Sequence, residues 1–194
     1  CGGRRMSSDY AAQARVFQED LVAFLQDLIR IPSLSGEERA VIKRIRAEME
    51  HLGYDDITVD PMGNLLGRIG SGRRVIALDG HVDTVDIADP SHWDRDPWSG
   101  EVEDGILYGR GAVDMKGGIA CFVAAALRHI EKQGARGSIS LLITGDEEGP
   151  SINGTTKVLD WMAQREERID ACVVGEPTNP GKIGDMIKIG RRGS

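Results

Sequence analysis

The sequence predicts an α/β domain in which helices cover a largely parallel, mixed sheet in three layers. Three short runs are apolar almost throughout, at 74–78, 138–144 and 171–174. Helical patterns separate these runs, and parallel strands joined by helices are typically buried on both faces. With 194 residues, 40% of them hydrophobic, the chain is long enough for one domain with its own core.

Two helices are expected before the first of these strands. Apolar residues at helical spacing predict a helix over 10–31. Ser35 and Glu38 fit a capping box, in which Ser35 is the N-cap and Glu38 reaches back to it. The second helix should therefore begin here, run to about Leu52 and stop at Gly53.

The remaining elements follow from alternating apolar runs and turn signals. Turn residues at 61–64 separate two short strand patterns, and Asp104-Gly105 is a hairpin signal. The expected elements are strands at 57–59 and 65–69, the strand at 74–78, a hairpin at 100–108, a helix at 116–130, the strand at 138–144, a helix at 154–162 and the strand at 171–174.

The charge balance argues against several partners. Lys and Arg total 24 and Asp and Glu total 31, for a net charge of −7. An acidic chain without a basic stripe is a poor candidate for binding nucleic acid or an anionic membrane. The longest apolar stretch, at 119–127, is too short to span a bilayer, and no signal-peptide pattern is found.

The three cysteines, Cys1, Cys121 and Cys172, cannot all pair with one another. Cys121 and Cys172 lie in apolar runs, where they are expected to be small core residues. We therefore expect a reducing, cytoplasmic compartment.

Histidine or carboxylate side chains follow each apolar strand, where an open α/β sheet binds its ligands. A glycine-rich loop, 109–118, opens the helix between the first two of these positions. The candidate residues are His81 and Asp83 after the first strand, Asp114 in the loop, Glu147 and Glu148 after the second strand, and Glu176 after the third.

One imidazole and several carboxylates suit a divalent metal ion. A carboxylate can bridge two such ions, and two ions can activate one water for hydrolysis. Asp83 lies two residues after His81 on an extended segment, so it can fix the second imidazole nitrogen. Each motif alone could be an ordinary turn or solvated loop, but their convergence favours a metal site. The loop lacks the Gly-Lys-Ser/Thr ending of a phosphate-binding loop, which argues against a nucleotide-binding module.

The motifs His81-Val82-Asp83, 109–118, Asp146-Glu147-Glu148 and 175–178, taken together and in order, resemble the dinuclear zinc deacylase and exopeptidase family. The resemblance implies a catalytic domain of zinc-exopeptidase type. It also implies two divalent ions, zinc first, with cobalt or manganese as alternatives.

The resemblance assigns a role to each candidate residue. His81, Asp114 and Glu176 would bind one ion, with Asp114 bridging to a second ion held by Glu148. Asp83 would orient His81, and Glu147 would be the general base. The peptide bond after Asp114 is often cis in the family.

Within the family, residues 138–194 are most similar to succinyl-diaminopimelate desuccinylases. That similarity implies that Arg191 and Ser194 hold a substrate carboxylate, although both could equally belong to a polar segment leading to a hinge. The loop at 84–90 lacks the early proline of many desuccinylases. Another deacylase or dipeptidase, such as one like acetylornithine deacetylase, therefore remains an alternative.

Family members are roughly twice this length, which is more than one typical domain supplies. We therefore expect residues 1–190 to be the first part of the catalytic domain, and 191–194 to begin the hinge to a lid and dimerisation domain. No histidine follows His129, so neither the late histidine ligand of the second ion nor the lid histidine is in this sequence.

The function expected from the sequence is hydrolysis of the amide bond of a small N-acyl amino acid. The first candidate is succinyl-diaminopimelate desuccinylase, in lysine and diaminopimelate biosynthesis, with a longer parent that dimerises through its lid. A non-catalytic fragment is the alternative from another class.

Overall fold

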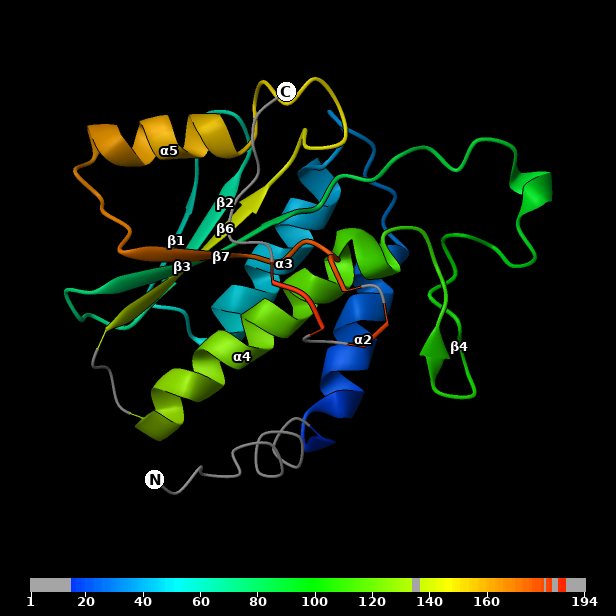
Figure 1. The fold of residues 1–194 in the computed structure, drawn as a ribbon, viewed down its shortest axis with the longest axis horizontal. Helices are drawn as coiled ribbons and strands as arrows, with labels where there is room; N and C mark the ends of the chain where they lie inside the picture. The colour runs from blue at the N-terminus through cyan, green and yellow to red at the C-terminus, as the bar shows by residue number, and fades with distance from the viewer. Residues whose placement is uncertain (1–14, 134–136, 180, 183–184, 188–194) are drawn as a thin grey trace.

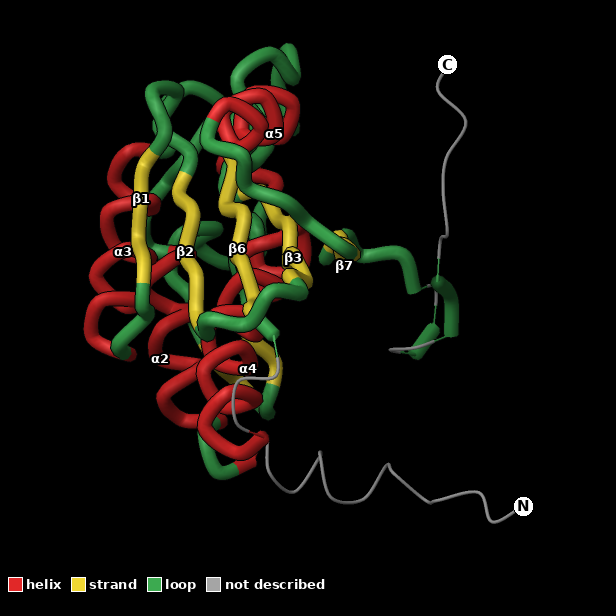
Figure 2. The backbone as a smooth tube through the Cα atoms, turned by 90° about the vertical axis from the view of Figure 1, so that its left-hand side faces the viewer, coloured by secondary structure: helices red, strands yellow, loops and turns green. Residues whose placement is uncertain are grey.

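The computed structural model describes residues 15–133, 137–179, 181–182 and 185–187. A five-stranded sheet in the order β1-β2-β6-β3-β7 forms its centre (Figures 1 and 2). The strands of this sheet are β1 (Asp56–Val59), β2 (Leu65–Ile69), β3 (Val75–His81), β6 (Ser138–Thr144) and β7 (Ala171–Val174). The helices are α2 (Gln18–Ile29), α3 (Arg39–Leu52), α4 (Gly117–Gln133) and α5 (Thr155–Gln164).

Strands β6, β3 and β7 run in parallel, whereas β2 is antiparallel to both β1 and β6. The predicted mixed, largely parallel sheet is therefore confirmed. In the register of the central strands, His81 pairs with Thr144 and Asp79 pairs with Val174. The carboxyl ends of these three strands consequently meet at one edge of the sheet.

Helices cover both faces of the sheet, as the three-layer prediction requires. Helices α2, α3 and α4 lie on one face and α5 lies on the other (Figure 2). The larger core includes Leu28, Ile45 and Ile119, which are completely buried against Leu141 of β6 and their other apolar neighbours. The smaller core packs α5 against β2, β6 and β3 through Leu66, Ala77, Leu142, Val158 and Met162.

A protruding arm separates β3 from α4 and carries two short elements (Figure 1). These are the 3-10 turn η1 (Pro90–His92) and the predicted hairpin, formed by β4 (Val102–Glu103) and β5 (Ile106–Leu107). Asp104 and Gly105, at φ 52° and 79°, make the turn, in the left-handed conformation that an Asp-Gly hairpin uses.

The start of α3 differs from the prediction. The helix begins at Arg39 with Glu38 as N-cap, and no side chain caps it. The capping box is therefore wrong, because the Ser35 and Glu38 side chains bind groups outside the helix. The predicted stop at Gly53 is confirmed, with φ 77° in the left-handed conformation.

The predicted burial of β7 is also wrong. All four residues of this strand are exposed, because β7 lies at the edge of the described sheet with β3 as its partner. Cys172 lies on this strand and Cys121 lies on α4, and both are exposed rather than core residues. Cys1 and the start of the first predicted helix, 10–14, lie outside the described residues, as does the predicted hinge at 191–194.

Within the described part of the chain, no helix is both long enough and apolar enough to cross a membrane.

Candidate metal centre

His81 is the last residue of β3, and its side chain is only 2% exposed. Its Nε2 atom faces three carboxylates, at 3.1 Å from Asp114 Oδ1, 3.5 Å from Glu176 Oε1 and 3.9 Å from Glu147 Oε2. Glu148 completes the group, since its carboxylate lies within 4.8 Å of ligand atoms of both His81 and Asp114. The sequence candidates with described positions therefore converge on one imidazole.

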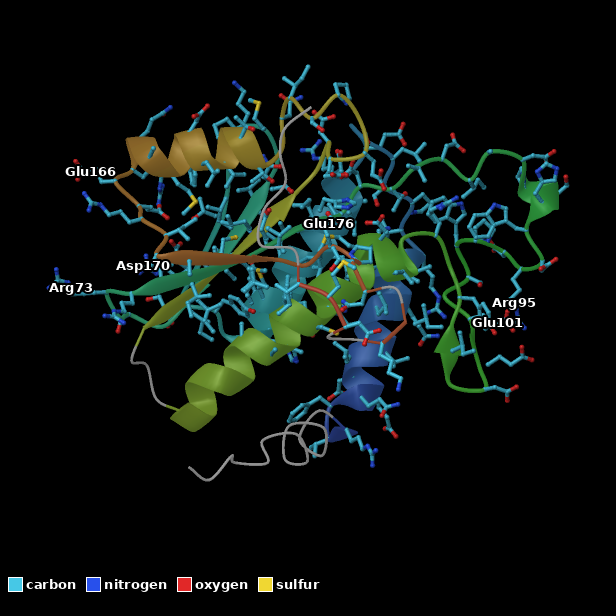
Figure 3. The ribbon with its side chains drawn as sticks, in the orientation of Figure 1. Arg73, Arg95, Glu101, Glu166, Asp170 and Glu176 are labelled. Carbon is cyan, nitrogen blue, oxygen red and sulfur yellow. The ribbon has the colours of Figure 1, made fainter. Side chains whose placement is uncertain are left out.

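The sheet register explains this convergence. The parallel pairing sets His81 opposite Thr144, so the turn with Glu147 and Glu148 begins beside the imidazole. The Gly175 amide donates to the Asp79 carbonyl at 3.0 Å, which brings the next residue, Glu176, to the same edge. Figure 3 shows Glu176 where the end of β7 approaches the start of α4.

Asp114 comes from the irregular segment η2 (Ala112–Lys116) that leads into α4. The Asp114–Met115 peptide bond is cis, as the family resemblance implied. Met115 is completely buried beneath the sheet edge, whereas the Asp114 side chain is 50% exposed. The segment therefore buries the Met115 side chain and presents the preceding side chain, Asp114, to the cluster.

Lys116 fastens this segment to the end of α2. Its ammonium group is completely buried and donates to the Leu28 carbonyl at 2.9 Å and the Ile31 carbonyl at 2.8 Å. Burial lowers the pKa of Lys116 to about 8. Sequence reasoning missed this residue, because nothing in a glycine-rich loop signals that its lysine is buried.

Asp83 lies behind His81 and is completely buried. His81 Nδ1 lies 3.0 Å from the Asp83 carbonyl oxygen and 3.3 Å from its Oδ1 atom. The Asp83 carboxylate also accepts from the Ser35 hydroxyl at 2.6 Å and from the amides of Glu147 and Glu148 at 3.1 and 2.9 Å. Burial raises the pKa of Asp83, but these hydrogen bonds more than offset it and hold the pKa at about 2.

The cluster stabilises a positive charge at its centre. Burial alone would lower the pKa of His81, but its hydrogen bond with Asp83 and the charges of Glu176, Asp83 and Glu147 raise it to about 9. Burial raises the pKa of Glu148 and of Glu176, and neighbouring carboxylates raise it further, although the charge of His81 partly offsets both effects. An excess of negative charge around one imidazole is an environment that a cation stabilises.

The spacing of the donor atoms fits a metal ion. Two ligand atoms that each lie about 2.0–2.2 Å from one ion are separated by roughly 3.3–3.6 Å in a tetrahedral site. The separations of His81 Nε2 from Asp114 and Glu176 are 3.1 and 3.5 Å. One imidazole with carboxylates is a donor set for zinc and similar divalent ions, so these residues fit a metal.

Two predicted residues, Arg191 and Ser194, lie outside the described residues. Sequence reasoning also missed the contact of Ser35 with the cluster. Its only local signal was the Ser-x-x-Glu pattern, which is equally typical of a helix start.

Comparison with known proteins places the chain in a family. Residues 77–189, which include His81, Asp114, both glutamates of the β6 turn and Glu176, match the model of peptidase family M20/M25/M40. The chain belongs to this family, whose relatives include metallopeptidases and deacylases.

The chain matches only part of each of these relatives. Over 183 residues the chain is 50% identical to succinyl-diaminopimelate desuccinylase of Rhodospirillum centenum, covering 90% of this chain and 47% of that protein. Human carnosine dipeptidase 1 has a similar fold, with a TM-score of 0.72 and a sequence identity of 22%. This match covers 84% of this chain and 39% of the dipeptidase. A dinuclear metal-binding M20 peptidase of Bacillus subtilis has a TM-score of 0.62 and a sequence identity of 22%. This match covers 82% of this chain and 43% of the Bacillus protein. The chain thus spans about half the length of the curated relative.

Proposed function

We propose that this chain carries the metal-binding part of an amidohydrolase that cleaves N-acyl amino acids, with N-succinyl-diaminopimelate as its first candidate substrate. The observation that carries the proposal is the convergence of Asp114, Glu148 and Glu176 on the buried imidazole of His81. The identity of 50% to a desuccinylase supports the choice of substrate.

We assign the metal ligands by their positions around the imidazole. His81, Asp114 and Glu176 would hold one ion, as the family resemblance implies, and the Asp114 and Glu176 oxygens lie 3.1 and 3.5 Å from His81 Nε2. Asp114 and Glu148 would hold a second ion, and the two oxygens of Asp114 suit a bridge. Zinc is the proposed metal, with cobalt or manganese as alternatives. When bound, such ions lower the pKa of a coordinated water and polarise an amide carbonyl.

Two residues would handle protons and orientation. Glu147 Oε2 lies 3.9 Å from His81 Nε2, and the Glu147 side chain is 53% exposed, so it can face both the cluster and a substrate. We assign it as the general base that accepts a proton from water and returns it to the leaving amine. Asp83 would keep the imidazole oriented through Nδ1.

We propose that the complete reaction also needs residues that bind the substrate and a lid domain of a longer parent protein. We propose that Arg191 and Ser194 hold a substrate carboxylate, because a guanidinium matches a carboxylate in a two-point hydrogen bond. A cytoplasmic parent that dimerises through a lid domain completes the proposal.

The test compares the chain with its Glu147→Gln variant, which keeps shape but removes the basic oxygen. Zinc content is measured together with hydrolysis of N-succinyl-diaminopimelate and of N-acetylornithine. We expect both chains to bind zinc equally. Activity, if the chain retains it without the rest of the parent, should fall at least about a hundredfold in the variant, the range for losing a general base.

Absence of bound zinc in both chains would overturn the proposal. Zinc binding with preferential cleavage of N-acetylornithine would retain the reaction and reject the substrate. A Glu147→Gln chain as active as the unchanged chain would reject the assignment of the base.

A further inference from the structure

The segment before α3 does something other than cap that helix. Ser35 donates its hydroxyl to Asp83 Oδ2 at 2.6 Å, across 48 residues of sequence. Glu38 Oε1 accepts from the Gly36 amide at 2.7 Å and from the Asp146 amide at 3.1 Å. Ser35 thus contacts the segment that carries His81 and Asp83, and Glu38 contacts the turn that carries Glu147 and Glu148.

Ser35 completes the surroundings of the Asp83 carboxylate. Oδ1 faces His81 Nδ1 and the Glu147 amide, while Oδ2 accepts from Ser35 and the Glu148 amide. Without Ser35, Oδ2 of the completely buried Asp83 would lose a charge-assisted hydrogen bond from a side chain that is itself half-buried.

Ser35 is itself held in place by the segment around it. The Ser33 carbonyl accepts from the Thr84 amide at 2.9 Å, and the Ser33 hydroxyl donates to the Val82 carbonyl at 2.7 Å. Leu34 and Thr84 form a parallel bridge. These contacts hold residues 33 and 34 beside residues 82 and 84, and so place the Ser35 hydroxyl next to Asp83.

Glu38 holds the other end of the glutamate turn. Asp146 lies in the left-handed backbone region, at φ 59°. The Oδ2 atom of its side chain accepts hydrogen bonds from the backbone amides of Ile152 and Asn153. The approach is close: a Cβ atom on Gly145 would lie 2.7 Å from the Glu38 carboxylate, and one on Gly149 would lie 2.9 Å from Ser35 Cβ. Two glycines thus allow the turn to pass against the α3 start.

We propose that Ser35 and Glu38 are positioning residues that fix Asp83 and the Asp146–Glu148 turn so that His81 and Glu148 both face the two-ion centre. This inference rests on the proposed function for its metal, but the positioning itself concerns only protein groups. The sequence pattern that resembles a helix cap is, in this fold, a support for the site.

The experiment uses the whole 194-residue chain and two independent readouts. Amide hydrogen exchange of Glu147 and Glu148 reports positioning without any metal. Titration of the metal-free chain with Co²⁺, followed by its visible absorption, reports affinity and coordination geometry. The variants are Ser35→Ala, Ser35→Thr, Glu38→Gln and the matched control Glu37→Gln, which changes an exposed neighbour.

We expect Ser35→Ala and Glu38→Gln to speed exchange of both amides at least about tenfold and to weaken Co²⁺ binding by about 10–100-fold, the range for losing an outer partner of a ligand. Ser35→Thr keeps the hydroxyl and should restore most of the affinity. Glu37→Gln should match the unchanged chain in both readouts. Circular dichroism and thermal unfolding are measured beside them, and a variant that unfolds globally would speed exchange of core strand amides as well.

The possible failures are distinguishable. If the unchanged chain binds no Co²⁺ but Ser35→Ala selectively frees the two amides, the proposed function fails and the positioning stands. If Co²⁺ binds and neither readout changes in a folded Ser35→Ala or Glu38→Gln chain, the positioning is wrong. Exchange that rises equally throughout the core of both variants, without rescue by threonine, also overturns it, since the side chains would then be general stabilisers.

Discussion

Protons and metal ions should compete for the His81 imidazole. A ligating imidazole is neutral, so the proton must leave before Nε2 can bind a metal. In the metal-free cluster, burial lowers the pKa of His81, but the hydrogen bond with Asp83 and the surrounding carboxylate charges raise it from 6.5 to about 9. The competition therefore extends well above neutral pH.

The expected size follows from that pKa. At pH 7.5, a group with a pKa of about 9 is about 97% protonated, so binding of the first ion should release about one proton from His81. An imidazole with the ordinary pKa of 6.5 would release about 0.1. The apparent affinity should rise about tenfold per pH unit between roughly pH 6.5 and 8.5, and level off only above the pKa.

Calorimetric titration with Zn²⁺ in buffers of different ionisation enthalpy counts the protons directly. The control is His51→Gln, which removes an exposed histidine on α3 and should leave the count unchanged. Asp83→Asn weakens the contact with Nδ1 and should lower the count. A count near 0.1 at pH 7.5, with an affinity independent of pH above 7, would refute this account of the cluster.

Three further predictions concern the free energy of unfolding and involve Lys116, Gly117 and Tyr54. Lys116→Met removes a lysine whose pKa is lowered from 10.5 to about 8 by burial in the folded chain. Between these two pH values the unfolded chain binds more protons than the folded chain, so the free energy of unfolding rises with pH. From pH 7.5 to 9.5 the unmodified chain should therefore gain about 2 kcal/mol of unfolding free energy relative to the variant, as measured by urea denaturation. Gly117→Ala places a Cβ 2.3 Å from the Ala112 carbonyl oxygen and should cost about 1–3 kcal/mol in the same assay, whereas an unchanged midpoint would show that the segment yields freely. Tyr54→Phe removes the buried hydroxyl that donates to the Val123 carbonyl at 2.8 Å and should cost about 1 kcal/mol, with a stabilised variant contradicting that contact.

Much of the site could be predicted because the sheet has few ways to arrange its strands. The apolar runs at 138–144 and 171–174 match β6 and β7 residue for residue. Parallel strands end at one edge, so histidine and carboxylates that follow them must meet there. This is why His81 and Glu176, which are 95 positions apart in the chain, could be expected in one cluster.

Other features depend on tertiary contacts that local sequence does not encode. The Ser-x-x-Glu pattern is the same whether Ser35 bonds to its own helix or to Asp83, and only the fold decides. An apolar run such as that of β7 cannot tell a central strand from an edge strand. Lys116 is buried because two carbonyls at the end of α2 face it, and neither carbonyl is visible in the sequence around the lysine.

The most direct test of the central claim is anomalous X-ray diffraction at the zinc absorption edge from crystals of this chain grown with Zn²⁺. The account predicts the strongest peak between His81 Nε2 and the carboxylates of Asp114 and Glu176, and a second site bounded by Asp114 and Glu148. The ligand distances at the first peak should be about 2.0–2.2 Å. Zinc peaks elsewhere on the chain, with this cluster empty at saturating zinc, would contradict the assignment of a metal centre.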